Sequence, residues 1–113
     1  MSGSAEVLER LMATVEKRVA QLPDGSYTTK LVRGGVEAIG AKIREEAEEV
    51  VEAAAESDEA GRAHLVHEVA DLLFHTMVMM AHRGIDWSDV AAELARREGV
   101  SGLEEKRRRG GVQ

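Results

Sequence analysis

The sequence contains no cysteine, and only three of its 113 residues are aromatic: one Phe, one Tyr and one Trp. The lack of cysteine excludes a disulfide framework and a thiolate metal site. With so few rings, aliphatic side chains and Met must fill the interior, and a chain of this length buries only roughly two-thirds of its unfolded surface. We therefore expect a single domain over residues 1–113 with a modest core, and a homodimer that enlarges this core.

Long apolar runs and a net positive charge are also lacking. No run of about 18 apolar residues is present, so we expect no membrane-spanning helix and no membrane partner. The first residues lack the basic-then-apolar pattern of a secretion signal, which favours a cytoplasmic protein. A net charge of −6 argues against nucleic-acid binding, which needs a positive face. The basic run at 106–109 is either a solvated tail or a segment that folds over a polyanionic ligand.

What the sequence does contain is helical periodicity. Apolar side chains recur at helical spacing over residues 4–22, 35–57, 60–83 and 86–99, and no strand pattern competes with them. Ser4 is the expected N-cap of the first helix, and Asp86 with Asp89 forms the expected capping box of the last. Residues 26–35 form a polar connection, and residues 100–113 are irregular apart from a possible turn at 103–106. The predicted fold is all-α and four-helix bundle-like, with a core at about 4–98 and a tail at 99–113.

One carboxylate of the helix at 35–57 is expected to face inward. Successive helical residues turn by about 100°, which puts Glu46 on the apolar stripe between Ile43 and Val50. A buried carboxylate is costly unless it is neutralised. The alternative to a functional carboxylate is a solvated acidic helix on which Glu46 is ion-paired, with Lys42 as the nearest cation.

The next helix carries a matching polar stripe. His64, Glu68, Asp71 and His75 follow i, i+4, i+7 and i+11 and therefore line one side of this helix. If the two helices pack antiparallel, Glu46 and Glu49 lie opposite Glu68 and Asp71. Four converging carboxylates form a hard oxygen cage that repels itself without a divalent cation, and such a cage suits Mg²⁺, with Mn²⁺ as a possible substitute.

The acidic spacing resembles that of a known superfamily. Glu45-Glu46-x-x-Glu49 followed by Glu68-x-x-Asp71 is similar to the EExxE…ExxD signature of the all-α, MazG-like nucleoside triphosphate pyrophosphohydrolases. Further segments resemble one branch, the phosphoribosyl-ATP pyrophosphohydrolases of histidine biosynthesis, over about residues 6–109. These segments are Ser26-Tyr27-Thr28-x-Lys30-Leu31, Gly34-Gly35, Lys42-Ile43-x-Glu45-Glu46, Glu68-x-Ala70-Asp71-Leu72-Leu73-Phe74-His75 and Arg97-x-Gly99-x-Ser101-Gly102-Leu103-Glu104-Glu105-Lys106.

The departures from this branch are mild. Ile43 stands for Val, Phe74 stands where Tyr is frequent, and residues 77–80 replace a run richer in Leu. No segment like the cyclohydrolase, which has cysteine ligands, is present, so the resemblance is to the stand-alone hydrolase rather than to the two-domain fusion.

The resemblance implies Mg²⁺-dependent hydrolysis of phosphoribosyl-ATP to phosphoribosyl-AMP and pyrophosphate, the second step of histidine biosynthesis. The implied metal ligands are Glu46, Glu49, Glu68 and Asp71. Glu45 is the implied general base or a ligand of a second ion, and Glu46 is essential for catalysis. The candidates for binding the substrate are Tyr27, Lys30 and Lys42, with Arg97, Lys106 and Arg109 as weaker ones. A plain packing role remains open for Tyr27, and His64 and His75 are either structural or partners of the metal ligands.

Three other interpretations stay open on the sequence. A MazG-like housekeeping enzyme would keep the chemistry and act on other nucleoside triphosphates, although the match in the C-terminal segment favours the histidine branch. A di-iron carboxylate bundle needs Glu-x-x-His, which occurs nowhere in the chain. A non-enzymatic helical adaptor would use the acidic stripe as a docking surface, but a docking surface has no need of an inward carboxylate at Glu46.

Overall fold

The computed structural model describes residues 3–99 and 102–109, and the side chains of 104 and 105 are not part of that description. Its helices are α1 Gly3–Gln21, α2 Tyr27–Arg33, α3 Gly35–Ala54, α4 Glu59–His82, α5 Trp87–Arg96 and α6 Gly102–Arg108. Because the described residues include no strand, the all-α prediction is confirmed. Among these helices, none combines the length and the apolar character that a membrane crossing requires. Residues 100–101 and 110–113 of the predicted tail lie outside the described residues.

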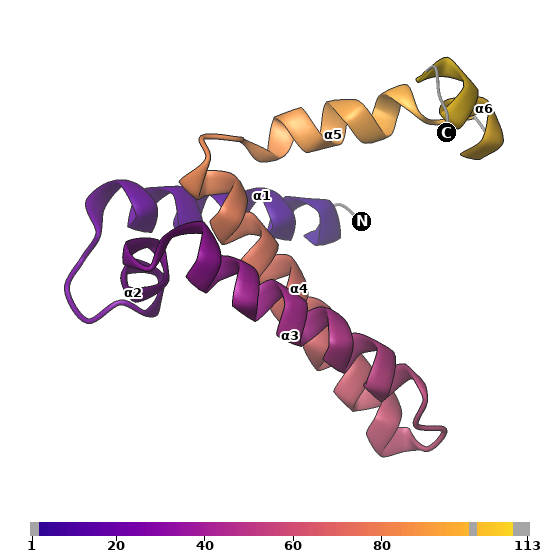
Figure 1. Ribbon diagram of the computed structural model, residues 1–113, viewed down its shortest axis with the longest axis horizontal. Helices are drawn as coiled ribbons and strands as arrows, with labels where there is room; N and C mark the ends of the chain where they lie inside the picture. Colours follow the sequence, from indigo (N-terminus) through magenta and orange to yellow (C-terminus); the bar gives the residue numbers. More distant parts are fainter. Residues whose placement is uncertain (1–2, 100–101, 110–113) are drawn as a thin grey trace.

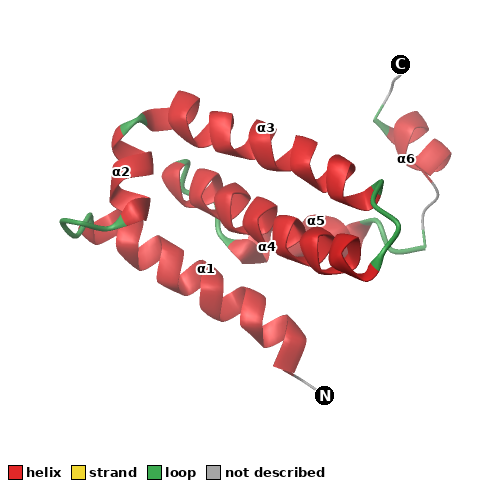
Figure 2. Ribbon diagram, turned by 90° about the horizontal axis from the view of Figure 1, so that it is seen from below, coloured by secondary structure: helices red, strands yellow, loops and turns green. Residues whose placement is uncertain are grey.

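Helix α4 is the centre of the fold. It lies between α1 and α3, while the short α2 joins these two at one end (Figure 2). The buried core takes one aliphatic side chain from each of the first four helices: Val15, Leu31, Ile39 and Val78. The longest contact is between α3 and α4, which pack antiparallel along most of their length (Figure 1). This pairing decides which side chains of the two helices face each other.

Helix α2 is a correction to the sequence prediction, which had only a polar connection at 26–35. Pro23 to Gly25 end the first helix, as predicted, and Ser26 then starts a new one as its N-cap, where its hydroxyl accepts from the N–H of Thr29. Thr28, Thr29 and Leu31 are buried against the other helices. Tertiary packing thus stabilises seven residues whose β-branched threonines give little helical preference on their own.

The other helix ends follow the prediction closely, with two corrections. The Asp86–Asp89 capping box is present, and Gly84 has a φ of +75° after α4, the left-handed conformation that glycine adopts readily. Ser4 is not an N-cap, because α1 already includes Gly3. The expected turn at 103–106 is a helix of two turns, α6.

Helices α5 and α6 form an arm that projects from the other four helices (Figure 1). The radius of gyration is 16.4 Å, whereas a compact chain of this length has one of about 13 Å. The accessible surface is 7701 Å², against roughly 6,100 Å² for a compact monomer of this mass. The single chain is therefore more open than a self-sufficient globular domain.

The connection between α3 and α4 is tight at one glycine. The N–H of Gly61 donates to the side chain of Asp58 at 2.8 Å, which caps α4. A Cβ atom at Gly61 would lie 2.5 Å from the Cβ and 2.8 Å from the backbone oxygen of Glu56. Neither atom is the end of a flexible side chain, so the backbone of the connection would have to move.

We predict that Gly61→Ala lowers the free energy of unfolding by about 1–3 kcal/mol, because this overpacking outweighs the higher helix preference of Ala. Gly40→Ala in α3 is the matched control, since a Cβ there meets only ordinary contacts at 3.9 Å. That substitution is expected to be neutral or to stabilise by up to about 1 kcal/mol. Urea unfolding at one protein concentration measures both, and a Gly61→Ala variant as stable as Gly40→Ala would contradict the tight connection.

Candidate functional site

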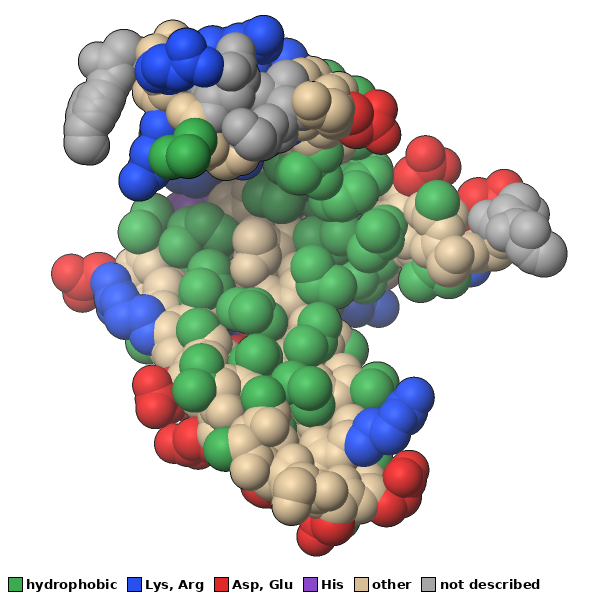
Figure 3. Space-filling model, turned by 90° about the vertical axis from the view of Figure 1, so that its right-hand side faces the viewer, with side chains coloured by type: hydrophobic (Ala, Val, Ile, Leu, Met, Phe, Trp, Pro, Cys, Tyr) green, Lys and Arg blue, Asp and Glu red, His purple; other side chains and the backbone are tan. Residues whose placement is uncertain are grey.

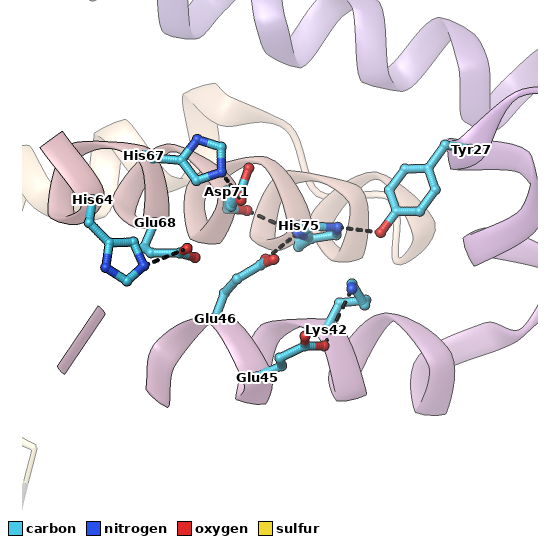
Figure 4. Close-up of polar contacts among 9 residues, drawn as sticks. All are labelled: Tyr27, Lys42, Glu45, Glu46, His64, His67, Glu68, Asp71 and His75. Carbon is cyan, nitrogen blue, oxygen red and sulfur yellow. Dashed lines mark hydrogen bonds and ion pairs between the residues drawn. The ribbon is translucent and has the colours of Figure 1, made fainter. Parts of the chain in front are cut away.

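Three carboxylates meet between α3 and α4. Glu46 and Glu49 come from α3 and Glu68 from α4, and one oxygen of each lies within 4.8 Å of the others (Figure 4 shows Glu46 and Glu68). The i, i+3 spacing puts Glu46 and Glu49 on the face of α3 that packs on α4. Only 5% of Glu46 and 7% of Glu68 is exposed, although both side chains are acidic. The predicted inward position of Glu46 is confirmed, while Glu48 and Glu52, on the opposite side of α3, are exposed.

The electrostatics of this cluster are unfavourable without a cation. One buried oxygen of Glu68 has no hydrogen-bond partner among the described residues, and one buried oxygen of Glu46 has only its contact with His75 Nδ1. The pKa of Glu49 is raised above its ordinary value, first by a hydrogen bond with the Glu68 carboxyl, then by burial and by the neighbouring glutamates. Two carboxyl groups can share such a bond only when one is protonated. Unpaired buried oxygens and converging negative charge are the features that a hard divalent cation relieves, so this donor set fits Mg²⁺ or Mn²⁺.

Asp71 lies at the edge of this cluster rather than within it. From the sequence we expected four carboxylates to converge, but Asp71 belongs to a second group of possible ligands with His67 and Glu68. Its carboxylate contacts His67 Nε2 at 3.2 Å. Asp71 comes three residues after Glu68 in α4, so its side chain is turned by about 60° from that of Glu68 about the helix axis. The turn is toward the side on which His67 lies. Glu68 is common to both groups and links them.

His75 is buried between Glu46 and Tyr27 (Figure 4). Its Nδ1 lies 3.0 Å from the backbone carbonyl of Asp71 and also contacts Glu46 Oε1. Since a carbonyl and a carboxylate oxygen both only accept, Nδ1 carries the hydrogen, and it faces the Asp71 carbonyl and Glu46 Oε1. In the neutral ring Nε2 then accepts from the Tyr27 hydroxyl at 2.8 Å. His75 therefore fixes the position of the Glu46 side chain, which is the partner role that the sequence analysis left open.

Two further histidines of α4, His64 and His67, hold carboxylates from the outer side. His64 contacts Glu56 at 3.3 Å and Glu68 at 3.2 Å, and hydrogen bonding to Glu56 is the main cause that raises the pKa of His64. His67 was not proposed from the sequence as part of the site. The signal that could have found it is its i, i+4 spacing to Asp71, the same spacing that joins His64 to Glu68.

The predicted cations are distributed unevenly around the cluster. Lys42 is half-buried and pairs with Glu45 at 3.3 Å (Figure 4). The solvated-helix alternative expected Lys42 to pair with Glu46, but its partner is Glu45, and Glu46 faces inward. Lys30 is exposed on α2, next to Tyr27. Arg97 and Lys106 are on the arm, where Arg97 pairs with Glu93 of α5 at 2.9 Å. Within the single chain, Arg97 and Lys106 are therefore separate from the carboxylates.

The raised pKa of Glu49 gives a test in the absence of metal. A carboxyl with a raised folded pKa stabilises the fold below its unfolded value of 4.5, and this contribution is lost as the pH rises through the folded value. We predict that, in chelator at neutral pH, Glu49→Gln melts at a higher temperature than the unsubstituted chain, and that the difference shrinks as the pH falls toward 4.5.

Glu48→Gln is the control for this measurement. It removes the same charge from the exposed side of α3 and is expected to show no such dependence on pH. Thermal unfolding followed by circular dichroism measures the three proteins. A Glu49→Gln midpoint at or below that of Glu48→Gln at neutral pH would contradict repulsion within the cluster.

Comparison with known proteins gives the family. The model of the phosphoribosyl-ATP pyrophosphohydrolase family matches residues 8–98. The chain is 65% identical to the phosphoribosyl-ATP pyrophosphatase of Rhodopirellula baltica over 94% of its own length and 88% of that protein. It is 49% identical to the enzyme of the same name from Variovorax paradoxus, over 92% and 86%. It is also 49% identical to the histidine biosynthesis bifunctional protein HisIE of Deinococcus radiodurans, over 90% of this chain and 45% of that protein. The chain belongs to the phosphoribosyl-ATP pyrophosphohydrolase family.

Proposed function

We propose that this protein hydrolyses phosphoribosyl-ATP to phosphoribosyl-AMP and pyrophosphate with Mg²⁺, as the second step of histidine biosynthesis. The observation that carries the proposal is the convergence of three carboxylates, two of them buried, between α3 and α4. The names of the relatives give the substrate class. Since this substrate and its products, a nucleotide and pyrophosphate, are all highly charged, we also propose that the protein works in the cytoplasm.

The carboxylates would hold the cation. Glu46, Glu49 and Glu68 are the proposed ligands, and Asp71 joins them through its group with Glu68. When bound, such an ion neutralises phosphate charge and activates water for attack on the phosphoanhydride. His75 and His64 keep the carboxylates of Glu46 and Glu68 in place through their own contacts. An acidic chain with net charge −6 needs this arrangement to bind a triphosphate at all.

Glu45 is the proposed general base. It lies on α3 beside the cluster, more exposed than the proposed ligands, where water has access to its carboxylate. Lys42, which pairs with it, orients this carboxylate and supplies positive charge for a phosphate. Tyr27 packs its ring against Phe74, with centroids 6.4 Å apart, and turns its hydroxyl to His75. Packing and a contact with the substrate are therefore compatible roles for Tyr27.

We predict that the purified protein releases pyrophosphate from phosphoribosyl-ATP with Mg²⁺, and that ATP, dUTP and dCTP give little. Glu46→Gln is expected to reduce the rate at least 100-fold, the order of loss typical when a ligand of a catalytic metal or its support is removed. Excess chelator should stop the reaction. Glu48→Gln, on the exposed side of α3, is the control and should keep the rate of the unsubstituted protein.

The alternative outcomes of this assay separate the hypotheses. Turnover of the simple triphosphates instead of phosphoribosyl-ATP would keep the metal site and move the protein to a housekeeping role. No turnover of any nucleotide, with no gain in melting temperature on adding Mg²⁺, would overturn the enzyme proposal.

We also propose a homodimer, in which α4 contributes to the interface. Val66, Val69 and Leu73 recur on one side of α4 and are 40–60% exposed. Figure 3 shows hydrophobic side chains gathered over one face of the molecule, between the basic end of the arm and the α3–α4 connection. Together with the large surface and radius of gyration, this open apolar area supports a second copy as the covering partner. A second copy would also give the arm, with Arg97 and Lys106, a surface to pack on.

We predict that Leu73→Glu shifts the protein from dimer to monomer in sedimentation velocity at micromolar concentration, because it adds a charge to the apolar area. Thr14→Glu adds the same charge to an exposed polar position of α1 and should leave the dimer intact. Circular dichroism checks that both variants keep their helices. An unsubstituted protein that sediments as a monomer, or a Leu73→Glu variant that stays dimeric, would contradict this interface.

A further inference from the structure

A polar cavity lies at the start of α2. Its volume is about 520 Å³, and it is lined by Gly25, Ser26, Tyr27, Thr29, Lys30 and Arg33. All of these residues come from the connection after α1 and from α2, the helix that the sequence analysis missed. The cavity is open to solvent, since Lys30 and Arg33 are exposed.

The charge of this cavity is opposite to that of the cluster. Lys30 and Arg33 line it, and no carboxylate does. Their i, i+3 spacing on α2 puts both cations on one side of the helix. Neither forms an ion pair with a carboxylate of the described residues, although acidic residues outnumber basic ones by 21 to 15 in the chain. Two such cations side by side are suited to an anionic ligand.

The polar groups of the cavity indicate which class of anion it would bind. Lys30 offers an ammonium group and Arg33 a planar guanidinium, and this pair matches the oxygens of a phosphate monoester. The Ser26 hydroxyl accepts from the Thr29 N–H at 3.4 Å, which leaves its own hydrogen free to donate. The Thr29 hydroxyl is already used, since it donates to the Pro23 carbonyl at 2.8 Å. The cavity therefore offers two charged donors and one neutral donor to a single phosphate.

Tyr27 connects this cavity with the cluster. Its side chain lines the cavity, and its hydroxyl bonds to His75, which in turn contacts Glu46 (Figure 4). Only the side chains of Tyr27 and His75 thus separate the cavity, which is suited to a phosphate without a metal, from the carboxylate cluster, which is suited to a metal-bound phosphate. A ligand that fills both needs two phosphate-bearing ends of different kinds.

Phosphoribosyl-ATP has such a structure, since it carries a triphosphate on one ribose and a single phosphate on the other. We infer that Lys30 and Arg33 bind the single phosphate of the phosphoribosyl group while the triphosphate lies at the carboxylate cluster. This inference rests on the proposed function and assigns to the cavity the choice between phosphoribosyl-ATP and ATP, which has no second phosphate. Arg33 was not a candidate residue in the sequence analysis, and Lys30 was assigned there to phosphates in general.

The test compares Lys30→Gln and Arg33→Gln with Lys17→Gln, which removes the same charge from an exposed position of α1. For phosphoribosyl-ATP, each of the first two is expected to lower kcat/KM roughly tenfold or more, the loss of one charge-assisted hydrogen bond, mainly through KM. The ATP concentration that half-inhibits the reaction should stay within about twofold of the unsubstituted value, because ATP leaves the cavity empty. Arg33→Lys keeps the charge and should recover part of the loss, which a folding defect would not do.

Each other outcome overturns the inference. A fall in kcat/KM no larger than that of Lys17→Gln would show that the cavity does not bind the substrate, and the proposed function would stand. An equal weakening of inhibition by ATP would mean that Lys30 and Arg33 hold the triphosphate instead. If the unsubstituted protein did not turn over phosphoribosyl-ATP, the proposed function would be wrong, and the inference would fail with it.

Discussion

The packing of α3 on α4 buries like charges against each other, and the rest of the site depends on this contact. Glu46 and Glu68 are almost fully covered by the two helices, and Glu49 lies within a few ångströms of both. Burial raises the free energy of each carboxylate, and the neighbouring charges raise it further. The surrounding side chains reduce this cost only partly, since one buried oxygen of Glu68 has no hydrogen-bond partner among the described residues. The contact between α3 and α4 therefore carries a free-energy cost that a bound cation would reduce.

Most of the framework of this site was predictable from the sequence, because helical periodicity alone decides which side of a helix a residue occupies. The inward position of Glu46 followed from Ile43 and Val50, and the stripe of α4 that holds Glu68 and His75 followed from residue spacing. What periodicity does not give is the rotation of one helix against the next. For this reason Asp71 was expected inside the cluster and lies at its edge with His67. The contacts of His75 with Tyr27 and Glu46 join three separate segments and could not be derived from any one of them.

Short helices were the weaker part of the prediction. In α2, Thr28 and Thr29 have little helical preference, and burial against α1, α3 and α4 compensates for it. The seven residues of α2, read as a sequence, give no information on the tertiary contacts that stabilise this helix. Because the sequence prediction lacked this helix, it also lacked the pairing of Lys30 and Arg33, which the helical spacing of α2 brings together. By contrast, Asp86 and Asp89 correctly predicted the start of α5, since a capping box is a local arrangement that needs no tertiary contact.

The tight packing at Gly61 has a consequence for how this protein can change over evolution. The close approach of Glu56 to Gly61 fixes both the length and the path of the connection between α3 and α4. A residue added to or removed from α4 between Gly61 and Glu68 would rotate Glu68 by about 100° about the helix axis and move it along α3 by about 1.5 Å. Glu68 would then turn away from Glu46 while every carboxylate of the signature was still present in the sequence. Insertions and deletions are usually tolerated near surface turns, but here the number of residues between the connection and Glu68 is part of the geometry of the carboxylate cluster. A homologue that kept the acidic signature and lost this spacing would be a helical hairpin without the chemistry.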